Sequence, residues 1–352
     1  MIVFYLLNSN MRYLLIILSL LFWGCEDILT QDESGLCDVD YTEFSNSCYY
    51  NDDISVLNSF IQNSGQSLNI GLDDSNNDGE ISWHELCRQN WVDGRLRLFS
   101  VFVGQVLPEN NCNLSGDIPD NIGNWSELEY LDLGYHPDPD NTSGLLTGTI
   151  PESIGNLSKL ESLYLYNNSF EGNVPDIFEG LTQLKVLWLC NNYFTGVLPE
   201  SLWSLLNLEI LYLEDNQFEG QINPAIINLV NLKDFWLNDN YFTGEIPDEI
   251  YNLSKLERLF IHNNQFEGQI SSSISNLTQL VKINIQNNLF SGEFPNEICS
   301  LDIDFGYTFI DDVYYLDYVW QDFNIENNYF CPEYPLCIQD YIGEQNTSEC
   351  EE

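Results

Sequence analysis

The chain has 352 residues and carries 55 Asp and Glu against 10 Lys and Arg, which gives a formal net charge of −45. This charge argues against nucleic acid as a partner, because phosphate binding requires clustered Lys and Arg. It also disfavours unaided docking on an anionic membrane surface. A hydrophobic content of 44% with 14% aromatic residues is enough for a core and excludes a disordered acidic tail. Ten Cys residues and an export signal indicate an oxidising compartment.

Residues 1–25 are predicted to be a signal peptide, with Met11 as the true start. The apolar run Tyr13–Trp23 is too short to span a bilayer. It ends in Gly24-Cys25, which resembles a bacterial lipobox and implies lipidation of Cys25. Plain secretion and an uncleaved anchor are the alternatives. No later stretch has transmembrane length, so a lipid would be the sole membrane anchor.

Residues 26–94 are expected to form the N-terminal cap region. Apolar spacing at i, i+3 and i+4 predicts a helix over 53–61, and a second helix is expected over 83–91. Between them, residues 74–85 resemble the twelve-residue calcium loop of EF-hand and dockerin proteins, with the turn glycine Gly79 at position 6. The resemblance implies a structural calcium ion and these ligands: Asp74, Asn76, Asp78, Glu80, Ser82 and Glu85. The alternative is an Asx-rich turn that enters a helix.

Residues 95–331 form a repeat array with a period of 24. Three of its columns are Leu, Asn and Phe, which begin at Leu160, Asn168 and Phe170 and recur through six consecutive copies. The apolar columns predict a short strand per coil whose side chains point into a shared core. The Asn column can bond turn backbone of neighbouring coils, which would otherwise be buried and unpaired.

This array resembles the 24-residue, plant-type leucine-rich repeat family with its Gly-x-Ile-Pro signature, as in Gly244-Glu-Ile246-Pro247. The resemblance implies an α/β solenoid: a right-handed superhelix with a concave parallel sheet and disulfide-bonded caps. Extra residues near 136–143 and an acidic insertion over 302–318 interrupt the period, and the insertion is expected to be a loop. Residues 332–352 are expected to be the C-terminal cap.

The cysteines lie where caps are expected, because stacked coils expose their end faces. Cys37 and Cys48 precede the array, and Cys87 and Cys112 flank its start. A second group surrounds its end: Cys299, Cys331, Cys337 and Cys350. The last four allow three connectivities, of which we expect 299–331 and 337–350. Cys190, at a concave strand position, is expected to remain a thiol. The sequence has no Cys-x-x-Cys pair, which argues against metal binding by these residues.

The concave face is the predicted ligand-binding face. One outward column, hereafter the aromatic row, consists of Tyr164, Trp188, Tyr212, Trp236 and Phe260. Arg258 and His262 flank it. Such rings serve as protein hot spots or stack on sugars; the alternative is that they pack on one another and stiffen the sheet.

No nucleophile elbow, phosphate-binding Gly loop or zinc signature occurs in the sequence, so we expect no enzyme. The sequence predicts a secreted or cell-surface protein, in an outer membrane if it is a lipoprotein, which binds another protein through the concave face. The alternative is a carbohydrate-binding or adhesion module that uses the aromatic row.

Overall fold

The structure is a computed structural model of the whole chain. It describes residues 37, 39–44, 47–64, 82, 86–101, 114–135, 145–303, 323–348 and 350, together with the backbone of 307–309 and 319–321.

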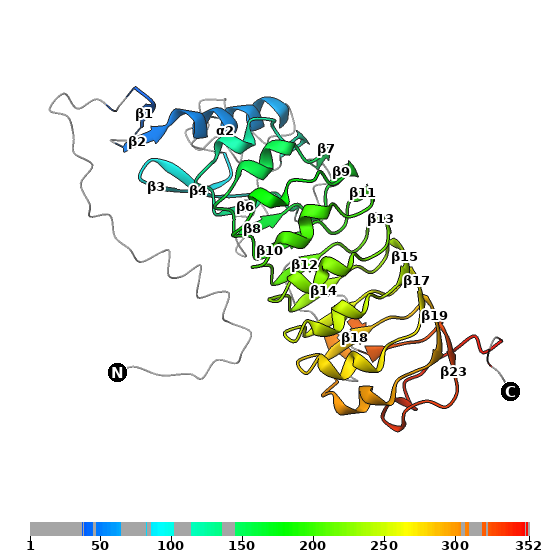
Figure 1. The fold of residues 1–352 in the computed structure, drawn as a ribbon. Coiled ribbons are helices and arrows are strands. Elements are labelled where there is room, and N and C mark those ends of the chain that lie inside the picture. The colour runs from blue at the N-terminus through cyan, green and yellow to red at the C-terminus, as the bar shows by residue number, and fades with distance from the viewer. Residues whose placement is uncertain are drawn as a thin grey trace, which may run out of the picture.

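The described coils stack into an elongated solenoid in which each coil adds one short strand to a ten-stranded sheet (Figure 1). From β4 onward every neighbouring pair in this sheet is parallel, and successive strands pair in register at the repeat period, as Leu187 does with Leu211. This confirms the predicted parallel solenoid sheet. Its strands are β3 (Arg88–Val92), β4 (Arg95–Ser100), β6 (Tyr130–Asp132), β8 (Ser162–Tyr164), β10 (Val186–Trp188), β12 (Ile210–Tyr212), β14 (Asp234–Trp236), β16 (Arg258–Phe260), β18 (Lys282–Asn284) and β22 (Phe323–Asn324).

A second parallel sheet of nine strands, which the sequence analysis did not predict, runs along the other side of the solenoid (Figure 1). Most of its strands begin just after the Asn column, and in most of them a glycine with positive φ lies at or near the end, for example Gly196 at 74°. A Cβ at Gly196 would lie 2.5 Å from Oδ1 of Asn173, so close packing of neighbouring coils also requires glycine. The strands are β5 (Gly116–Asp117), β7 (Leu146–Gly148), β9 (Ser169–Asn173), β11 (Tyr193–Gly196), β13 (Gln217–Gly220), β15 (Tyr241–Glu245), β17 (Gln265–Gly268), β19 (Leu289–Glu293) and β23 (Tyr329–Cys331).

Short 3-10 helices complete the coils. Several start directly after a proline in extended conformation, such as Pro199 before η8 and Pro247 before η10, because proline has no N–H to lose at a helix start. The 3-10 helices are η5 (Ile122–Asn124), η6 (Glu152–Asn156), η7 (Phe178–Gly180), η8 (Glu200–Ser204), η9 (Pro224–Asn228), η10 (Asp248–Asn252), η11 (Ser272–Asn276), η12 (Asn296–Ser300) and η13 (Leu336–Ile338).

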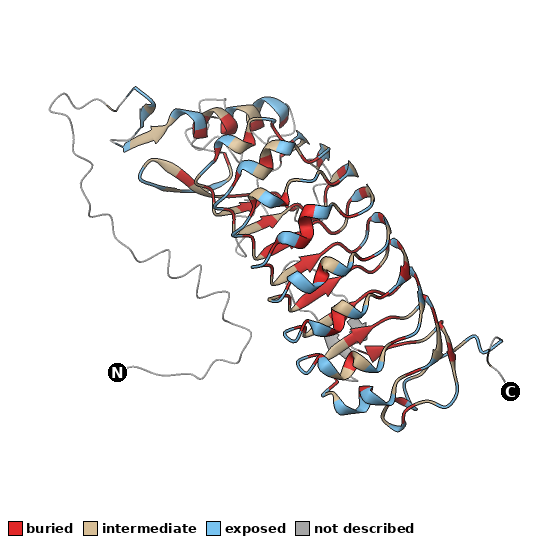
Figure 2. Cartoon of the chain, viewed as in Figure 1, coloured by how far each residue is buried: buried red, intermediate tan, exposed pale blue. Residues whose placement is uncertain are grey.

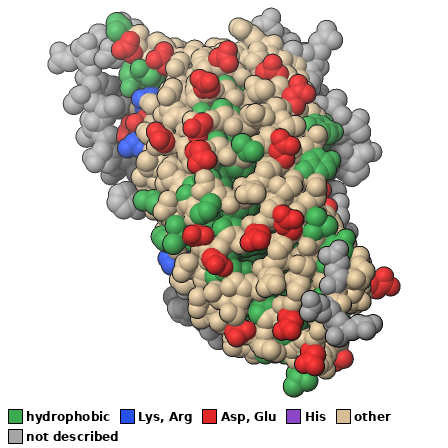
Figure 3. Space-filling view, turned by 45° about the vertical axis from the view of Figure 1, so that its right-hand side comes forward, with side chains coloured by type: hydrophobic (Ala, Val, Ile, Leu, Met, Phe, Trp, Pro, Cys, Tyr) green, Lys and Arg blue, Asp and Glu red, His purple; other side chains and the backbone are tan. Residues whose placement is uncertain are grey.

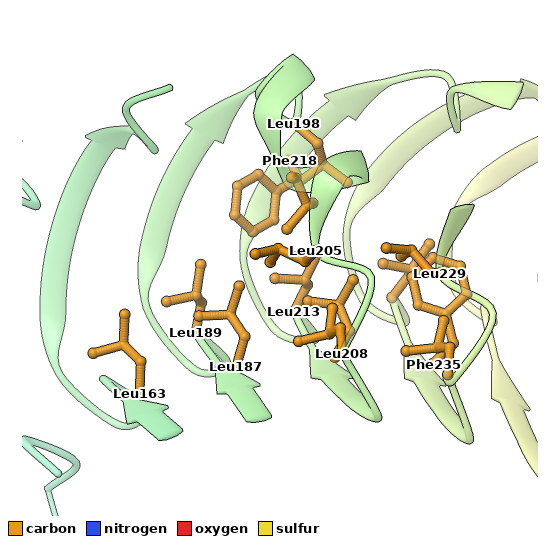
Figure 4. Packing of buried hydrophobic residues seen from close by; sticks show 14 of the residues in the cluster. Leu163, Leu187, Leu189, Leu198, Leu205, Leu208, Leu213, Phe218, Leu229 and Phe235 are labelled. Carbon is orange, nitrogen blue, oxygen red and sulfur yellow. The ribbon is translucent and has the colours of Figure 1, made fainter. Parts of the chain in front are cut away.

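One continuous apolar core fills the space between the sheets and the 3-10 helices (Figure 2). Leucines at the ten-stranded sheet, such as Leu187 of β10 and Leu213 directly after β12, point inward toward Leu205 and Phe218 (Figure 4). The Phe column stacks along the solenoid, with ring centroids 6.1 Å apart between Phe194 and Phe218. Each coil therefore buries its apolar side chains against its neighbours, which a single coil could not do.

The Asn column bonds backbone groups of neighbouring coils, as predicted. The side chain of Asn216 donates to the carbonyl of Leu189 in the preceding coil at 2.9 Å and accepts from the backbone N–H of Phe194 at 3.0 Å. The same pattern recurs at Asn192, Asn240 and further along the column. These bonds satisfy buried turn groups that the sheets leave unpaired.

Helix α2 (Asn51–Ser64) and the antiparallel pair β3–β4 close the N-terminal end of the array. The prediction of a helix over 53–61 is confirmed, because these residues lie within α2. Phe60 of this helix stacks on Phe99 and Trp125 of the first coils. The expected helix over 83–91 is wrong in its second half, since residues 88–91 belong to strand β3.

The buried carboxylate of Asp53 ties α2 to the sheet. It accepts from Arg95 at 2.9 Å and from the backbone N–H of Leu96 at 2.9 Å. A buried charge requires such pairing, so this contact fixes α2 over the end of the solenoid. Two hairpins lie outside the coils: β1 (Tyr41–Phe44) with β2 (Ser47–Tyr50), and β20 (Tyr307–Phe309) with β21 (Val319–Gln321).

Disulfides lie at both ends. Cys37 bonds to Cys48, and Cys87 is also disulfide-bonded. At the C-terminal end the bonds are Cys299–Cys337 and Cys331–Cys350, so the expected pairing 299–331 and 337–350 is wrong. The reason is geometric: the cap folds back along the last coil, so that η13, which contains Cys337, packs on η12, which contains Cys299. Cys190 is a buried thiol, as expected.

Candidate binding face

The outward side chains of the ten-stranded sheet form three columns in register. Within β10, Leu187 points into the core, whereas Val186 and Trp188 point away from it and pack in a second apolar cluster. Alternation along a strand places every second residue on one face. The sequence-predicted residues Tyr164, Trp188, Tyr212, Trp236 and Phe260 therefore do share one face, and the structure brings Arg258 and His262 beside them.

The aromatic row is a packed stack. Ring centroids lie 5.0 Å apart between Trp188 and Tyr212, 4.3 Å between Tyr212 and Trp236, and 4.9 Å between Trp236 and Phe260. The planes of the first two pairs differ by only 20° and 22°. Trp188 has an exposed fraction of 8% and Trp236 of 2%, so the row is buried although it lies outside the main core.

This geometry bears on what the row can bind. The nearly parallel planes of Trp188, Tyr212 and Trp236 mean that these rings use their faces against one another. Tyr164 meets Trp188 edge to face at 82°, and Phe260 is tilted by 48° from Trp236. Sugar stacking requires an accessible ring face, whereas Tyr212 and Trp236 present their faces to each other. The alternative in which the aromatic residues pack on one another therefore has direct geometric support at these positions.

An ion pair borders the row. Arg258 donates from Nη2 to Oδ2 of Asp234 at 2.8 Å, and its side chain keeps an exposed fraction of 37% while that of Asp234 has 4%. Burial raises the pKa of Asp234, and the charge and hydrogen bond of Arg258 oppose that shift. The pair thus combines a fixed buried acid with a guanidinium that reaches solvent. Arg258 was predicted from the sequence, but its pairing with Asp234 was not. The opposite charges of these two residues, 24 positions apart in one column, could have indicated the pair.

His262 lies at the other border of the row and is buried. Burial lowers its pKa to about 4, although the carboxylate of Asp239, with 3.7 Å between Nε2 and Oδ2, opposes the shift. The imidazole is therefore neutral at pH 7. A buried neutral histidine offers no accessible general acid or base at the surface.

Several predicted site residues lie outside the described part of the chain. They are Asp74, Asn76, Asp78, Glu80 and Glu85 of the calcium loop, the lipidation candidate Cys25, and Cys112. Ser82 is described and is half-buried. Within the described ranges, no group of three His, Cys, Asp or Glu is placed to hold a metal ion. Likewise, no helix that the structure describes is long and apolar enough to cross a membrane.

Comparison with known proteins agrees with this architecture. Residues 158–218 match one family model described as "Leucine rich repeat", and 231–253, 255–277 and 279–301 match a second with the same description. The chain is a leucine-rich repeat solenoid. No curated protein matches the chain.

Solved structures of this repeat class are similar over part of their length. The leucine-rich repeat ectodomain of the membrane receptor kinase GASSHO1/SCHENGEN3 from Arabidopsis thaliana, in complex with CASPARIAN STRIP INTEGRITY FACTOR 2, is 30% identical with a TM-score of 0.54. The alignment covers 63% of this chain and 24% of that one. The PEPR1–AtPEP1 structure is 26% identical with a TM-score of 0.62, and the alignment covers 80% of this chain and 35% of that one.

The Arabidopsis receptor kinase HAESA, in complex with the peptide hormone IDA and the co-receptor SERK1, is 26% identical with a TM-score of 0.56. That alignment covers 67% of this chain and 37% of that one. The leucine-rich repeat solenoid described here therefore spans about a quarter to two fifths of these receptor structures.

Proposed function

We propose that this leucine-rich repeat solenoid is a non-enzymatic interaction protein that binds a protein or peptide ligand on the outward face of its ten-stranded sheet. The observation that carries the proposal is the similarity, at 26–30% identity, to receptor solenoids that are themselves described in complex with a peptide hormone or protein factor. An extracellular or cell-surface location fits the same similarity and the disulfide-bonded ends.

Arg258 is the residue on which we expect ligand binding to depend most. Arginine is over-represented at interface hot spots, where it forms bidentate bonds with carboxylates. The half-exposed guanidinium of Arg258 is already oriented by Asp234 and lies beside the buried aromatic row. A ligand carboxylate could therefore be bound without the cost of ordering a mobile side chain.

The test is a binding screen with the full chain immobilised, probed with a panel of secreted peptides and proteins and with a glycan panel. Arg258→Gln should weaken a protein ligand by tenfold or more, because a charge-assisted bond contributes about 1.5–3 kcal/mol. Lys185→Gln is the matched control, since Lys185 also pairs with an acid of the preceding coil, Glu161, at 2.7 Å, but lies at the edge of the sheet. Equal loss in both variants would contradict a site at Arg258.

The same screen tests the carbohydrate alternative. A saturable glycan signal that disappears in the Trp188→Ala/Trp236→Ala variant while the variant keeps its melting temperature would favour a glycan ligand. A large fall in melting temperature would instead assign these residues to the scaffold, as their stacked geometry leads us to expect.

We also propose that the loop over 74–85 binds one calcium ion with a structural role. The proposal rests on residue types at loop spacing, with Trp83 inside the loop as a natural sensitiser. Terbium luminescence excited through tryptophan should rise on titration and fall on competition with calcium. Glu85→Gln, which removes the bidentate ligand, should weaken terbium binding strongly, and an unchanged titration in that variant would contradict the site.

Lipid attachment at Cys25 is proposed as the membrane anchor. Metabolic labelling with a palmitate analogue should mark the wild-type chain, whereas Cys25→Ser should lose both the label and membrane fractionation. A labelled Cys25→Ser chain would contradict the assignment.

A further inference from the structure

The nine-stranded sheet exposes a row of side chains whose period is twice that of the coils. In β11 and β15 the first residue is an exposed tyrosine, with exposed fractions of 56% for Tyr193 and 54% for Tyr241. The intervening strand β13 begins with Gln217, and the strand after β15 begins with Gln265. Large rings at this exposure are not part of any core, so the fold itself does not explain them.

The strand register places a carboxylate beside each of these tyrosines. Glu171 of β9 is the direct partner of Tyr193, and Glu219 of β13 is the direct partner of Tyr241. Each of these four residues is next to a core phenylalanine in its own strand, as Tyr193 is to Phe194. Because side chains alternate along a strand, all four point outward. Paired residues on neighbouring strands extend side by side on one face. The sheet therefore displays two copies of one composite unit, a carboxylate next to an aromatic ring.

A third copy carries leucine in place of tyrosine. Glu267 is the partner of Leu289, which is also exposed. Between the first two copies, uncharged pairs intervene, for example Thr195 with Gln217, whereas between the second and the third Glu245 is the partner of Glu267. Successive copies are separated by two strands, and the register shifts by two residues from each strand to the next, since Tyr193 lies beside Glu171 and Thr195 beside Gln217. The two tyrosines are therefore offset along the strands as well as across the sheet.

The charge of these units is not balanced within the sheet. None of the Lys and Arg residues of the sequence falls in any of its nine strands. Figure 3 brings this side forward and shows Asp and Glu among apolar side chains, with Lys and Arg only toward the left margin.

The ten-stranded sheet is different in this respect. Along its edge the charge alternates in sign, so that Lys185 pairs with Glu161 at 2.7 Å and Lys233 with Glu209 at 2.5 Å. On the nine-stranded sheet the alternation is between Glu and Thr. Glu245 of β15 also lies directly beside Glu267 of β17. The carboxylates therefore have no cation from the same sheet, and their pattern does not account for the tyrosines.

We propose that the exposed face of the nine-stranded sheet is a second docking surface, which binds an extended basic segment of a partner protein. Each carboxylate–ring unit accepts one Lys or Arg: the carboxylate forms the ion pair and the ring adds a cation–π contact. Gln217 and Gln265 lie between the units and can bond the peptide backbone of the segment.

The experiment uses the full chain and two extended proline-rich peptides of equal length: the matched peptide contains four arginines, and the second contains four glutamines at the same positions. Titration calorimetry at about 0.15 M salt measures binding of each, because the Debye length there is about 8 Å and long-range attraction is screened. The matched peptide should bind at least about tenfold tighter. Equal affinity of the two peptides, or no binding of either, overturns the proposal.

Two sets of variants localise the site. Tyr193→Ser/Tyr241→Ser should weaken the matched peptide about tenfold, through loss of two cation–π contacts. Neutralising the three acids as Glu171→Gln/Glu219→Gln/Glu267→Gln should weaken it at least as much. These residues are on the surface, so an unchanged melting temperature verifies that the fold is kept.

The matched control removes the same number of charges from exposed acids of the 3-10 helices, with Glu152→Gln, Asp248→Asn and Glu297→Gln. This control should change the affinity by less than about twofold. An equal loss in the control means that only the overall negative charge of the chain attracts the peptide, which overturns the proposal. Tyrosine-dependent binding of a neutral oligosaccharide such as cellohexaose, with no peptide binding, also overturns it.

Discussion

Replacement of one asparagine in the buried column tests why the coils stack. Asn240 has an exposed fraction of 5%. Its side chain donates to the carbonyls of Leu213 at 2.9 Å and Leu237 at 3.1 Å, and it accepts from the backbone N–H of Phe218 at 2.9 Å. In Asn240→Ala all of these bonds are lost at once.

The expected loss of stability depends on which hydrogen bonds the former partners of Asn240 keep in the variant. The carbonyl of Leu213 still accepts from Asn216, and that of Leu237 still accepts from Asn264, so neither is orphaned. The buried N–H of Phe218 loses its acceptor, which costs about 1–3 kcal/mol, and the lost donated bonds add about 1 kcal/mol. We therefore expect Asn240→Ala to lower the free energy of unfolding by about 3 kcal/mol.

Urea unfolding, followed by tryptophan fluorescence and by far-UV circular dichroism, measures this change. Both signals are needed, because a repeat array can lose cooperativity when one interface weakens. Asn207→Ala is the control: Asn207 is exposed and makes one bond, to the carbonyl of Thr182 at 2.9 Å, so its loss should cost less than about 1 kcal/mol. A loss in Asn240→Ala no larger than in this control would refute the reasoning.

Four further outcomes are expected. Burial holds the pKa of His262 at about 4, so the unfolded state binds more protons than the folded state between pH 6.5 and 4. As the pH falls through this range, the wild type should lose roughly 3 kcal/mol of unfolding free energy relative to His262→Gln. Burial raises the pKa of Asp132 to about 6, so the sign reverses and the wild type should gain roughly 3 kcal/mol relative to Asp132→Asn as the pH falls from 6 to 4. Urea titrations across this range measure both, and parallel profiles would contradict the burial argument. Trp236→Leu should lower the free energy of unfolding by about 2–4 kcal/mol, measured by the same titration, and an unchanged value would mean that the stack adds no stability. Cys299→Ser/Cys337→Ser should cost about 4 kcal/mol, and peptide mapping of the wild type should recover the 299–337 bond; recovery of 299–331 would contradict the structure.

The parts of the fold that the sequence predicts are those in which every coil contributes the same residue. The Leu column predicts the parallel sheet, and the Asn column predicts the inter-coil bonds, because each has one physical role that is repeated. Helix α2 was also predictable, since Val56, Leu57 and Phe60 give it an apolar stripe at helical spacing.

The second sheet could not be predicted in the same way. Its strands are two to five residues long, and those from β9 onward bury a single aromatic residue each, a pattern that a turn shares. They become strands only because neighbouring coils bring them into register. The disulfides around η13 are similar, since three connectivities satisfy the sequence and only the path of the cap selects one.

The state of the aromatic row also depends on neighbours rather than on residue type. The sequence places Trp188 and Trp236 on an outward face, and the structure agrees, but outward did not mean exposed. Adjacent coils supply rings at 4.3–5.0 Å, so each ring buries its neighbours. Residue type and column position therefore predicted which side chains meet, and could not predict how much of each remains accessible to a ligand.

Core positions of the chain repeat every 24 residues, whereas some surface positions repeat every 48 residues. The core requires a period of 24, because every coil must fill the same interior, and the Leu, Asn and Phe columns obey it. Stacking places no requirement for a period of 48 on outward positions. Such a period, as between Tyr193 and Tyr241, must arise from interactions between side chains of different coils or with a partner. At the edge of the ten-stranded sheet, ion pairs between coils account for it. On the nine-stranded sheet no such ion pair is formed among the described residues of its strands, and the partner proposed above would supply the missing cations.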